Sequence, residues 1–477
     1  MPGKDLREFI EKLKQVNDAR TIKSEVDWNL EAAAIMRRSN EIGGPVTVFE
    51  NIKDCPGYRL AGGITAQFSR IAIALDMEPT ASYTEILDEY IKRRKALIKP
   101  MVVTDGKCKE NIILGNDVDL SKIPAPMIHP DDGGRYLGTL YVGVCKDLDS
   151  DWMNWGTYRM MVSDEKTACV WLNPFNHGGI IHKKYEDNNK PMQYAAVFGV
   201  NPLMNLVAGA GVPYGVNEVD VAGGLMQEPV ELIKCETNDL YVPADAELII
   251  EGEILPHERK TEGPFGEGPA YLVPGDANPR PFINVTAITH RNNAIIPVNS
   301  LGIPPDEAIT VECIAWGADI KIALLDEGIP ITGVYIPPES SLYSLVVGVK
   351  NTYFGIPQRV ANCVWGNRNG QFIPKIFVVD DDIDPTNMDE VIHAFSVKCN
   401  PIRGIRIDEG AFSCPLTPYL PVGLKDKGMG GGNVLFDCTW PKEWKEENIP
   451  IKCAFSGYPK DIQEKVKSRW HKDYELD

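Results

Sequence analysis

Two glutamates flank a short glycine-rich segment of the chain, Glu262-Gly263-Pro264-Phe265-Gly266-Glu267. The glycines and the proline predict a tight turn in a strand-rich region, and neither glutamate lies on a helical face. Such a turn can direct both acids to one point, where two nearby carboxylates cannot both ionise freely and one acquires a raised pKa. The segment therefore suits a general acid. A turn with two solvent-exposed acids is the structural alternative.

Further side chains that could do chemistry precede this turn. Asn154 and Arg159 lie in the segment NWGTYR, His177 follows in PFNHGG, and Glu231 opens the run ELIKC. An amide oxygen, a neutral imidazole and a carboxylate can together bind a divalent cation such as Mn²⁺, with phosphate oxygens and water completing the coordination. No spacing among them is diagnostic, because His177 could be structural and Glu231 could pair with Lys234 or Arg159.

The composition bounds the class of protein. A chain of 477 residues predicts two or three domains. A hydrophobic content of 43% and a charged content of 24% are typical of a soluble globular protein. The net charge of -18, without any block rich in Lys and Arg, argues against a nucleic-acid partner and against an anionic membrane surface.

The sequence shows neither a long apolar run nor an apolar segment behind a basic N-terminus, so we expect a cytoplasmic protein. The chain has 11 cysteines, an odd number, and no C-x-x-C pair. This pattern indicates neither a disulfide framework nor a structural zinc site. We expect the cysteines to be small buried hydrophobic residues.

Hydrophobic periodicity divides the chain into four parts. Residues 1–115 alternate helical patterns with short apolar runs, which predicts an N-terminal α/β domain with helices at 5–15, 28–41 and 83–95. Residues 116–304 carry β-rich runs separated by Gly, Pro and Asn, which predicts an antiparallel sandwich or barrel with one helix near 217–228. The runs are YVGVC, TACVWL, YAAVFGV, ELIKC, AELIIEGEIL, FINVTAIT and AIIPVN.

Residues 305–440 return to an α/β pattern, with predicted strands ITGVYIP, YSLVVGV and KIFVVDDDID and predicted helices at 306–327, 356–366 and 387–396. Asp380, Asp381 and Asp382 end the third strand, where ligands often bind in open α/β sheets, although a solvated strand end is an equal alternative. Residues 441–477 form a tail whose helix, near 459–472, follows an irregular Gly-rich stretch from Lys427 to Asn433. A helix tethered so loosely often docks on a neighbouring subunit.

Taken in order, these segments resemble the UbiD-type decarboxylases, above all the branch with ferulate, cinnamate, hydroxyarene and heteroarene carboxylate decarboxylases. The resemblance implies an N-terminal α/β domain, a central split β-barrel that binds prenylated flavin mononucleotide (prenylated FMN), and a C-terminal α/β oligomerisation domain with a tail helix. The segments that carry it are NWGTYR (154–159), PFNH (174–177), VELIKCETNDLYVPADAELIIEGE (230–253), EGPFGE (262–267), RNNAIIP (291–297) and KIFVVDDDID (375–384).

Carried over residue by residue, the resemblance implies a role for each motif. Asn154, His177 and Glu231 would bind Mn²⁺ or a similar divalent cation that bridges the protein to the flavin phosphate, and the family also allows a K⁺ ion. Arg159, Glu262 and Glu267 match the catalytic Arg-Glu-Glu network of the family, with Glu267 as the proton donor. The residues expected to contact the flavin itself are Thr157, Tyr158, Arg159, Trp171 and Leu172.

The implied reaction is the non-oxidative, reversible decarboxylation of an aromatic, heteroaromatic or α,β-unsaturated carboxylic acid. Loss of carbon dioxide from an sp² carbon leaves a poorly stabilised carbanion, and side chains provide no electron sink. The resemblance implies that prenylated FMN is the covalent electron sink. Arg159 would hold the substrate carboxylate beside Glu262, and Glu267 would protonate the vacated carbon.

The expected substrate pocket departs from the ferulate branch. Glu312 and Cys414 stand where that branch has apolar residues, whereas Leu416 keeps the apolar character. A buried acid is costly beside an apolar ring, so an acid with a polar ring or a second polar substituent is at least as good a candidate as cinnamate. Further candidates for the pocket are Asn176, Asn299 and Ser300.

The resemblance also implies partners: a flavin prenyltransferase that supplies the cofactor, and further copies of the chain in a dimer or hexamer. Two other classes stay open, a flavin-dependent oxidoreductase on a flavin-binding β-barrel and a non-catalytic cofactor carrier. Arg159 with its two glutamates disfavours the oxidoreductase because hydride transfer needs no such proton-donor network, and no G-x-G-x-x-G motif follows a predicted strand. A flavin spectrum without turnover would favour the carrier.

Overall fold

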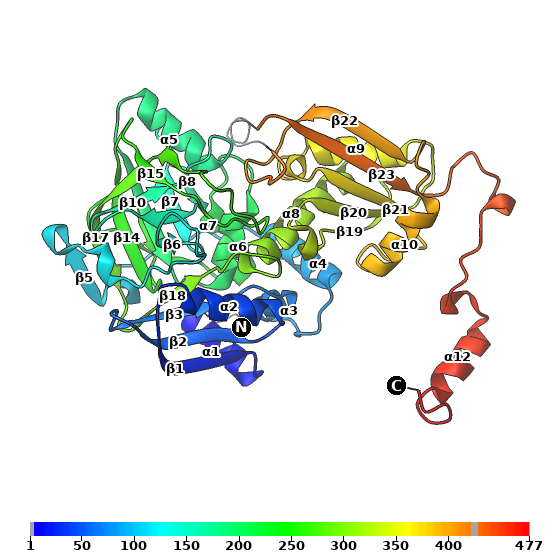
Figure 1. The fold of residues 1–477 in the computed structure, drawn as a ribbon, viewed down its shortest axis with the longest axis horizontal. Coiled ribbons are helices and arrows are strands. Elements are labelled where there is room, and N and C mark those ends of the chain that lie inside the picture. Colours follow the sequence, from blue (N-terminus) through cyan, green and yellow to red (C-terminus); the bar gives the residue numbers. More distant parts are fainter. Residues whose placement is uncertain (1–3, 421–427, 477) are drawn as a thin grey trace.

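The computed structural model describes residues 4–420 and 428–476. Figure 1 shows an N-terminal part, a middle part above it, a C-terminal part beside the middle one, and a tail that leads away from the C-terminal part. One apolar core cluster includes residues of all three parts, among them Leu13, Trp155 and Val347. The candidate site therefore lies in a continuous body.

A four-stranded sheet is the centre of the N-terminal part. Helix α1 begins at Leu6 because the Asp5 carboxylate accepts a hydrogen bond from the Glu8 amide, and its apolar stripe is buried as predicted. The strands in pairing order are β1 (Ala19–Val26), β2 (Val46–Ile52), β3 (Tyr58–Gly62) and β18 (Ala294–Val298), and the helices are α1 (Leu6–Gln15), α2 (Glu31–Glu41) and α3 (Phe68–Ala74).

The placement of β18 differs from the prediction. The run AIIPVN was assigned to the middle sheet, but β18 pairs in parallel with β3 of the N-terminal sheet, so that assignment is wrong. All five residues of β18 are buried. A continuous apolar run carries no period that identifies its partner strand, so only tertiary pairing decided it.

A nine-stranded, entirely antiparallel sheet forms the middle part. Its edge strands β6 and β8 do not pair with each other in the described chain, so the sheet is a curled half-barrel and not a closed one (Figure 1). The strands in pairing order are β6 (Tyr136–Gly138), β9 (Met160–Val162), β10 (Thr167–Val170), β17 (Phe282–His290), β14 (Leu248–Ile254), β11 (Met192–Phe198), β7 (Val142–Lys146) and β8 (Met153–Gly156), with β5 (Asn111–Leu114) beside β17.

Smaller elements surround this half-barrel. One three-stranded sheet contains β13 (Tyr241–Pro243), β12 (Glu231–Lys234) and β4 (Met101–Val102), and one hairpin contains β15 (Lys260–Glu262) and β16 (Asn278–Arg280). The helices are α5 (His177–Asp187), α6 (Pro202–Ala210) and α7 (Glu218–Met226). Only α7 was predicted. Helix α6 is buried on nearly all sides, and the first turn of α5 contains two glycines, so neither has a clear helical period.

A five-stranded sheet forms the C-terminal part, and the three predicted helices of this part are present. Strands β22 and β23 were not predicted. The glycines at the start of β23 suggested an irregular segment, and Lys427 of that segment lies outside the described residues. The strands in pairing order are β19 (Ile331–Tyr335), β20 (Ser344–Val349), β21 (Lys375–Asp380), β23 (Gly431–Cys438) and β22 (Ile405–Ala411). The helices are α8 (Glu307–Asp326), α9 (Ile356–Gly366) and α10 (Met388–Lys398).

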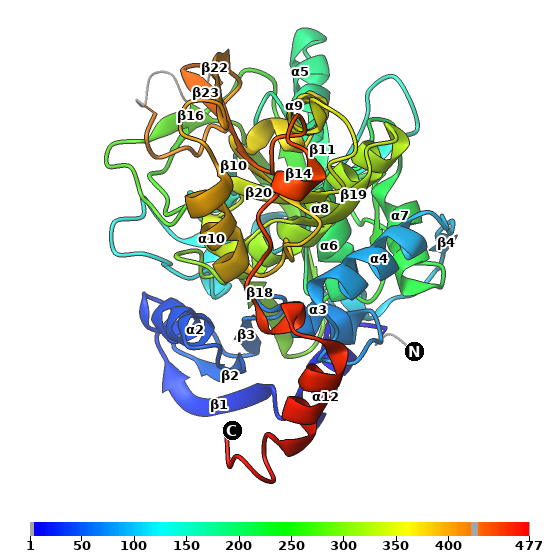
Figure 2. The same ribbon diagram turned by 90° about the vertical axis from the view of Figure 1, so that its right-hand side faces the viewer.

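Helix α8 joins the parts, because it packs against α6 and against α4 (Tyr83–Arg94). The tail carries α12 (Lys460–Arg469), which buries none of its residues and stands apart from the body in Figure 1. In Figure 2 the molecule is turned so that the tail faces the viewer. No helix in residues 4–420 and 428–476 is long and apolar enough to cross a membrane. Short 3₁₀ helices lie at 107–109, 115–117, 120–122, 338–340, 370–372, 446–448 and 455–457.

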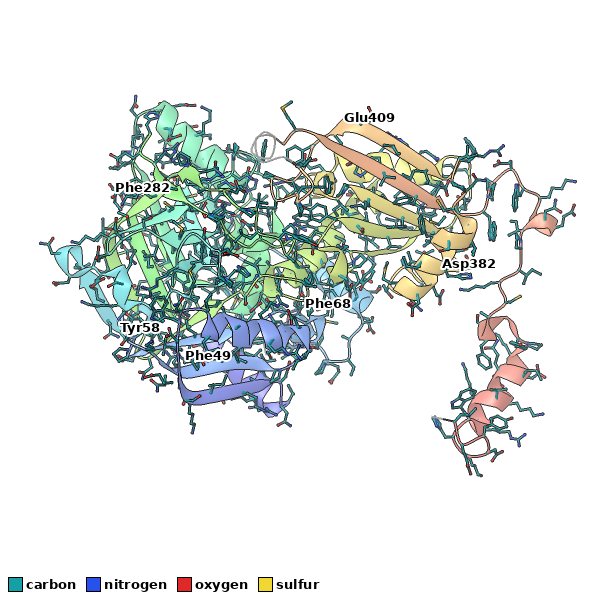
Figure 3. The ribbon with its side chains drawn as sticks, in the orientation of Figure 1. Phe49, Tyr58, Phe68, Phe282, Asp382 and Glu409 are labelled. Carbon is teal, nitrogen blue, oxygen red and sulfur yellow. The ribbon has the colours of Figure 1, made fainter. Side chains whose placement is uncertain are left out.

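Two of the three acids at the end of β21, Asp380 and Asp382, are paired with a lysine. Lys398 Nζ lies 3.1 Å from Asp380 Oδ2 and 2.8 Å from Asp382 Oδ1. Figure 3 places Asp382 on the C-terminal part, on the side away from the half-barrel that carries Phe282. These carboxylates therefore end a strand and do not join the site described next.

Candidate active site

A cavity of about 350 Å³ lies where the half-barrel meets the C-terminal part. Its volume falls in the range of small-molecule and cofactor sites. The wall is formed by the end of β8, the start of α5, the end of α6, one face of α8 and three segments of the C-terminal part, 341–343, 368–372 and 414–416. Several of the predicted functional residues meet there.

Arg159 is the centre of an ion-pair network on this wall. Its Nη2 donates to Glu262 Oε2 at 2.7 Å, and its Nη1 forms an ion pair with Glu267. Gly263, between the two acids, has φ +92°, a conformation that glycine adopts without strain. The guanidinium lies 4.4 Å from the centre of the Trp171 ring. The turn thus directs both acids to one point, as the sequence predicted.

Glu262 is held at both oxygens. Its second oxygen accepts a hydrogen bond from Tyr136 Oη at 2.6 Å, and the Tyr136 ring stacks on Phe265 of the same turn at 3.9 Å. Glu262 is fully buried. With both oxygens occupied by donors, this carboxylate is suited to orient Arg159.

Glu267 faces the cavity and has the properties of a proton donor. Burial raises the pKa of Glu267 above its ordinary value; the Arg159 charge opposes this, and the Glu262 and Asp132 charges add to it. The sequence predicted a raised pKa from repulsion between the two glutamates, but burial is the larger cause. A larger protonated fraction near neutral pH is what a general acid requires.

The predicted metal ligands do not all meet. Glu231 is exposed at the start of β12 and lines a separate small cavity with Lys4 and Glu228, so its grouping with Asn154 and His177 is wrong. The physical reason is the pairing of β12, which lies in the three-stranded sheet with β13 and β4 and not beside β8. Sequence order alone does not reveal that separation.

Glu218, at the start of α7, stands where Glu231 was expected. Its Oε1 accepts a hydrogen bond from Asn154 Nδ2 at 3.0 Å and lies 3.6 Å from His177 Nδ1, while its Oε2 accepts from the Trp155 amide at 3.0 Å. The side chain is 2% exposed. The sequence feature that could have identified Glu218 is an acid at the start of the predicted apolar helix 217–228.

The surroundings of Glu218 fit a bound cation. In the described chain no Lys or Arg lies within ion-pair distance of this buried carboxylate, and an uncompensated buried charge is costly. No cluster of three His, Cys, Asp or Glu side chains is suited to a metal in residues 4–420 and 428–476. A metal site formed by Asn154, His177 and Glu218 therefore depends on the amide oxygen of Asn154. This oxygen accepts a hydrogen bond from Tyr158 Oη at 2.7 Å.

Positive charge gathers at the same end of the cavity. His177 is the first residue of α5, which is capped by Asn176, whose Oδ1 accepts from the Gly179 amide at 2.8 Å. Arg368 Nη1 contacts His177 Nε2 and donates to the Val212 carbonyl at 2.6 Å. A helix N-terminus beside a guanidinium suits a phosphate group. Arg368, a lone arginine in a loop, gave no signal in the sequence.

The other predicted contact residues divide into two groups. Thr157, Tyr158, Trp171 and Asn176 line the cavity, although the Asn176 oxygen is used by the helix cap. Leu172 packs in the apolar core instead.

Two predicted pocket residues, Asn299 and Ser300, do not reach the cavity. They are buried in the protein and donate to Asp306 Oδ1 and the Ala33 carbonyl at 3.4 and 3.0 Å. Their prediction as pocket residues is wrong.

Glu312, Cys414 and Leu416 do line the cavity. Burial raises the pKa of Glu312 to about 8, and the Asp306 and Glu267 charges add to the effect. Burial likewise raises the pKa of the Cys414 thiol to about 12. Glu312 makes no hydrogen bond or ion pair within the described residues. At neutral pH the Glu312 carboxyl group in the cavity is therefore largely protonated, and it has no partner within the described residues.

Three family models match successive parts of the chain. They describe the N-terminal, Rift-related and C-terminal domains of 3-octaprenyl-4-hydroxybenzoate carboxy-lyase, the UbiD family, and match residues 10–90, 101–304 and 313–438. Together they cover most of the chain.

Curated relatives match over nearly the whole length. The chain is 33% identical to pyrrole-2-carboxylic acid decarboxylase of Pseudomonas aeruginosa, covering 98% of this chain and 97% of the relative. It is 31% identical to ferulic acid decarboxylase 1 of Saccharomyces cerevisiae, covering 98% of both.

Solved structures agree with this result. The UbiD-class enzyme HmfF from Pelotomaculum thermopropionicum, in complex with FMN, has a TM-score of 0.83 at 28% identity, covering 94% of this chain and 97% of that one. Vanillic acid decarboxylase of Sedimentibacter hydroxybenzoicus in closed form has a TM-score of 0.86 at 28% identity, covering 98% of both. The chain belongs to the UbiD family of decarboxylases.

Proposed function

We propose that this carboxy-lyase removes carbon dioxide, reversibly and without net oxidation, from an aromatic, heteroaromatic or α,β-unsaturated acid with the help of prenylated FMN. The observation that carries the proposal is the convergence of Glu262 and Glu267 on Arg159 at the wall of one cavity. An evolved dimeric form of HmfF has been solved with prenylated FMN. An oxidoreductase has no evident use for this acid network.

The half-barrel would be the split β-barrel that holds the flavin. Asn154, His177 and Glu218 would bind a divalent cation such as Mn²⁺, which would offset the negative charge of the flavin phosphate, and Arg368 would bind that phosphate. A K⁺ ion next to the divalent cation stays a prediction. Gly156 and Gly178 support the assignment, because a Cβ at either position would lie within 2.6 Å of Tyr158 Oη and displace the ring that contacts Asn154.

The acid network would act on the substrate carboxylate and on the carbon that loses it. When bound, the prenylated flavin supplies the electron sink that no side chain provides. Arg159 would orient the carboxylate while Glu262, itself held by Tyr136, keeps the guanidinium in place. Glu267, whose pKa is raised chiefly by burial, would then deliver its proton to the vacated carbon.

Glu312 points to the substrate class. Its largely protonated carboxyl group lines the same cavity as Trp316 and Leu416 and interacts electrostatically with Glu267 and Cys414. A substrate that pairs with this group avoids burying it unsatisfied. We therefore expect a hydroxyarene or N–H heteroarene carboxylate to be preferred over unsubstituted cinnamate.

The proposal also covers the domain boundaries, the oligomeric state of the protein and the source of its cofactor. The domains would be 1–115, 116–304 and 305–440, followed by the tail 441–477. The exposed helix α12, which carries the exposed Ile462 and is followed by the exposed Trp470, would dock on another copy in a homodimer or homohexamer. A flavin prenyltransferase would supply the cofactor, and a cytoplasmic location stays a prediction.

The test is to co-express the chain with a flavin prenyltransferase and to measure carbon dioxide release from aromatic, heteroaromatic and acrylic acids. We expect release from at least one class, lost in Arg159→Ala and kept in Arg38→Ala, which alters an exposed arginine. A protein that carries prenylated FMN and releases carbon dioxide from none of these acids would contradict the proposal.

A further inference from the structure

A buried carboxylate lies beneath the turn that carries Glu267, outside the cavity wall. Asp132 belongs to the loop between the 3₁₀ helix at 120–122 and β6, and its side chain is fully buried. One oxygen accepts a hydrogen bond from the Gly266 amide at 2.9 Å, and the other accepts from the His129 amide at 2.8 Å. The first bond ends on the residue just before Glu267.

The ring of His129 completes the pair. Its Nδ1 lies 3.2 Å from both oxygens of Asp132, and its Nε2 lies 2.8 Å from the Leu301 carbonyl. Both ring nitrogens thus face acceptors, and only the imidazolium form donates to two acceptors. Burial lowers the pKa of His129, and the Arg37 charge lowers it slightly. The hydrogen bond to Asp132 and the charge of that carboxylate together outweigh these effects, so the net pKa is raised.

The same loop holds the turn at a further point. The Gly133 amide donates to the Pro264 carbonyl at 2.7 Å. A Cβ on Gly133 would lie 2.0 Å from the Gly263 carbonyl oxygen, and a Cβ on Gly266 would lie 2.3 Å from His129 Nδ1. The contact is therefore too close for any side chain at Gly133 or Gly266. The backbone that precedes Glu267 is therefore held in place by the loop that carries His129, Asp132 and Gly133.

We propose that Asp132, held by His129, is a positioning residue for the proton donor, because it fixes the Gly266 amide and so the direction of Glu267. The same buried carboxylate also acts on Glu267 through its charge. This inference rests on the proposed role of Glu267 as the acid. It adds a function to two residues outside the cavity.

The electrostatic part of the proposal follows from the groups around Glu267. After burial, the charges of Glu262 and Asp132 raise its pKa while Arg159 lowers it. Of these two carboxylates, Glu262 is held by Arg159 and Tyr136, whereas Asp132 raises the pKa of Glu267 without touching Arg159. The titratable and charged groups that interact with Glu267 are Arg159, Glu262, Asp132, Tyr136, Glu312 and Cys414.

Asp132→Asn tests this proposal, because the amide keeps the size and one acceptor oxygen but removes the charge. The titration of Glu267 is followed in the unloaded protein as the carboxylic-acid C=O infrared band that is absent from Glu267→Gln. We expect its midpoint to move to lower pH and kcat of the loaded enzyme to fall by roughly tenfold or more, with flavin content unchanged. Asp131→Asn is the matched control, since Asp131 is exposed.

A second variant keeps the proposal testable if Asp132→Asn does not fold. His129→Gln removes the positive partner of Asp132, so the midpoint of Glu267 should move to higher pH, the opposite direction. A midpoint in Asp132→Asn equal to that of Asp131→Asn would overturn the proposal, even if kcat fell, because Asp132 would then be only structural. The infrared midpoint needs no turnover, so it separates failure of this inference from failure of the decarboxylase proposal.

Discussion

Glu312→Gln should stabilise the protein, and the gain should grow with pH. The wild-type chain keeps a carboxyl group in a cavity where burial raises its pKa from the ordinary 4.5 to about 8. Glutamine has nearly the same size and cannot ionise. The change therefore removes the cost of burying a charge and leaves the packing on α8 intact.

The sign and size of the effect follow from proton linkage. Below pH 4.5 both the folded and the unfolded state hold the proton, so Glu312 costs nothing there. Between pH 4.5 and about 8 the unfolded state loses the proton first, and wild-type stability falls with rising pH. At about 1.36 kcal/mol per pH unit, the cost reaches roughly 3 kcal/mol at pH 7 and roughly 5 kcal/mol above pH 8.

Thermal unfolding of the unloaded protein measures this effect at pH 5, 6, 7 and 8. An unfolding entropy of about 2.1 cal/mol/K per residue gives about 1 kcal/mol/K for a chain of 477 residues. Glu312→Gln should therefore raise Tm by roughly 3 °C at pH 7 and by less than about 1 °C at pH 5. Glu165→Gln, an exposed site, is the control. A Tm gain that does not depend on pH, or a loss at pH 8, would refute the reasoning.

Four further outcomes are expected. Glu218→Ala should lose the divalent metal and the flavin, by metal analysis and visible spectrum, whereas Glu231→Ala should keep both; the reverse result would return Glu231 to the site. Glu267→Gln should lower turnover by roughly 10²-fold and slow deuterium incorporation from heavy water while the flavin stays bound, with Glu165→Gln unaffected; a near-normal rate would remove Glu267 from the mechanism. For the wild type, kcat/KM should be higher for an acid that carries a hydrogen-bond donor than for cinnamate, by up to about 10⁴-fold, and Glu312→Leu should reduce this ratio of kcat/KM values. If both proteins preferred cinnamate, Glu312 would not be the residue that selects the substrate. Shortening the chain after residue 440 should yield smaller oligomers by light scattering, and an unchanged mass would rule out the tail as the docking element.

Local features of this protein followed from the sequence by itself. The two acids of the turn at 262–267 are only five residues apart, so a glycine-rich turn brings them together whatever the rest of the fold does. Helices such as α9 and α1 were predicted at nearly their observed bounds, because an apolar stripe and terminal residues encode them within one segment. The order of motifs was enough to identify the family.

Tertiary structure decided which distant groups meet. Glu218 and Glu231 are both acids beside apolar runs, and only the pairing of β12 with β13 and β4 excludes Glu231 from the site. Asn299 follows β18, whose pairing with β3 carries it into the core and away from the cavity. The physical reason is that strand pairing and burial depend on contacts between segments far apart in the chain, which no local period encodes.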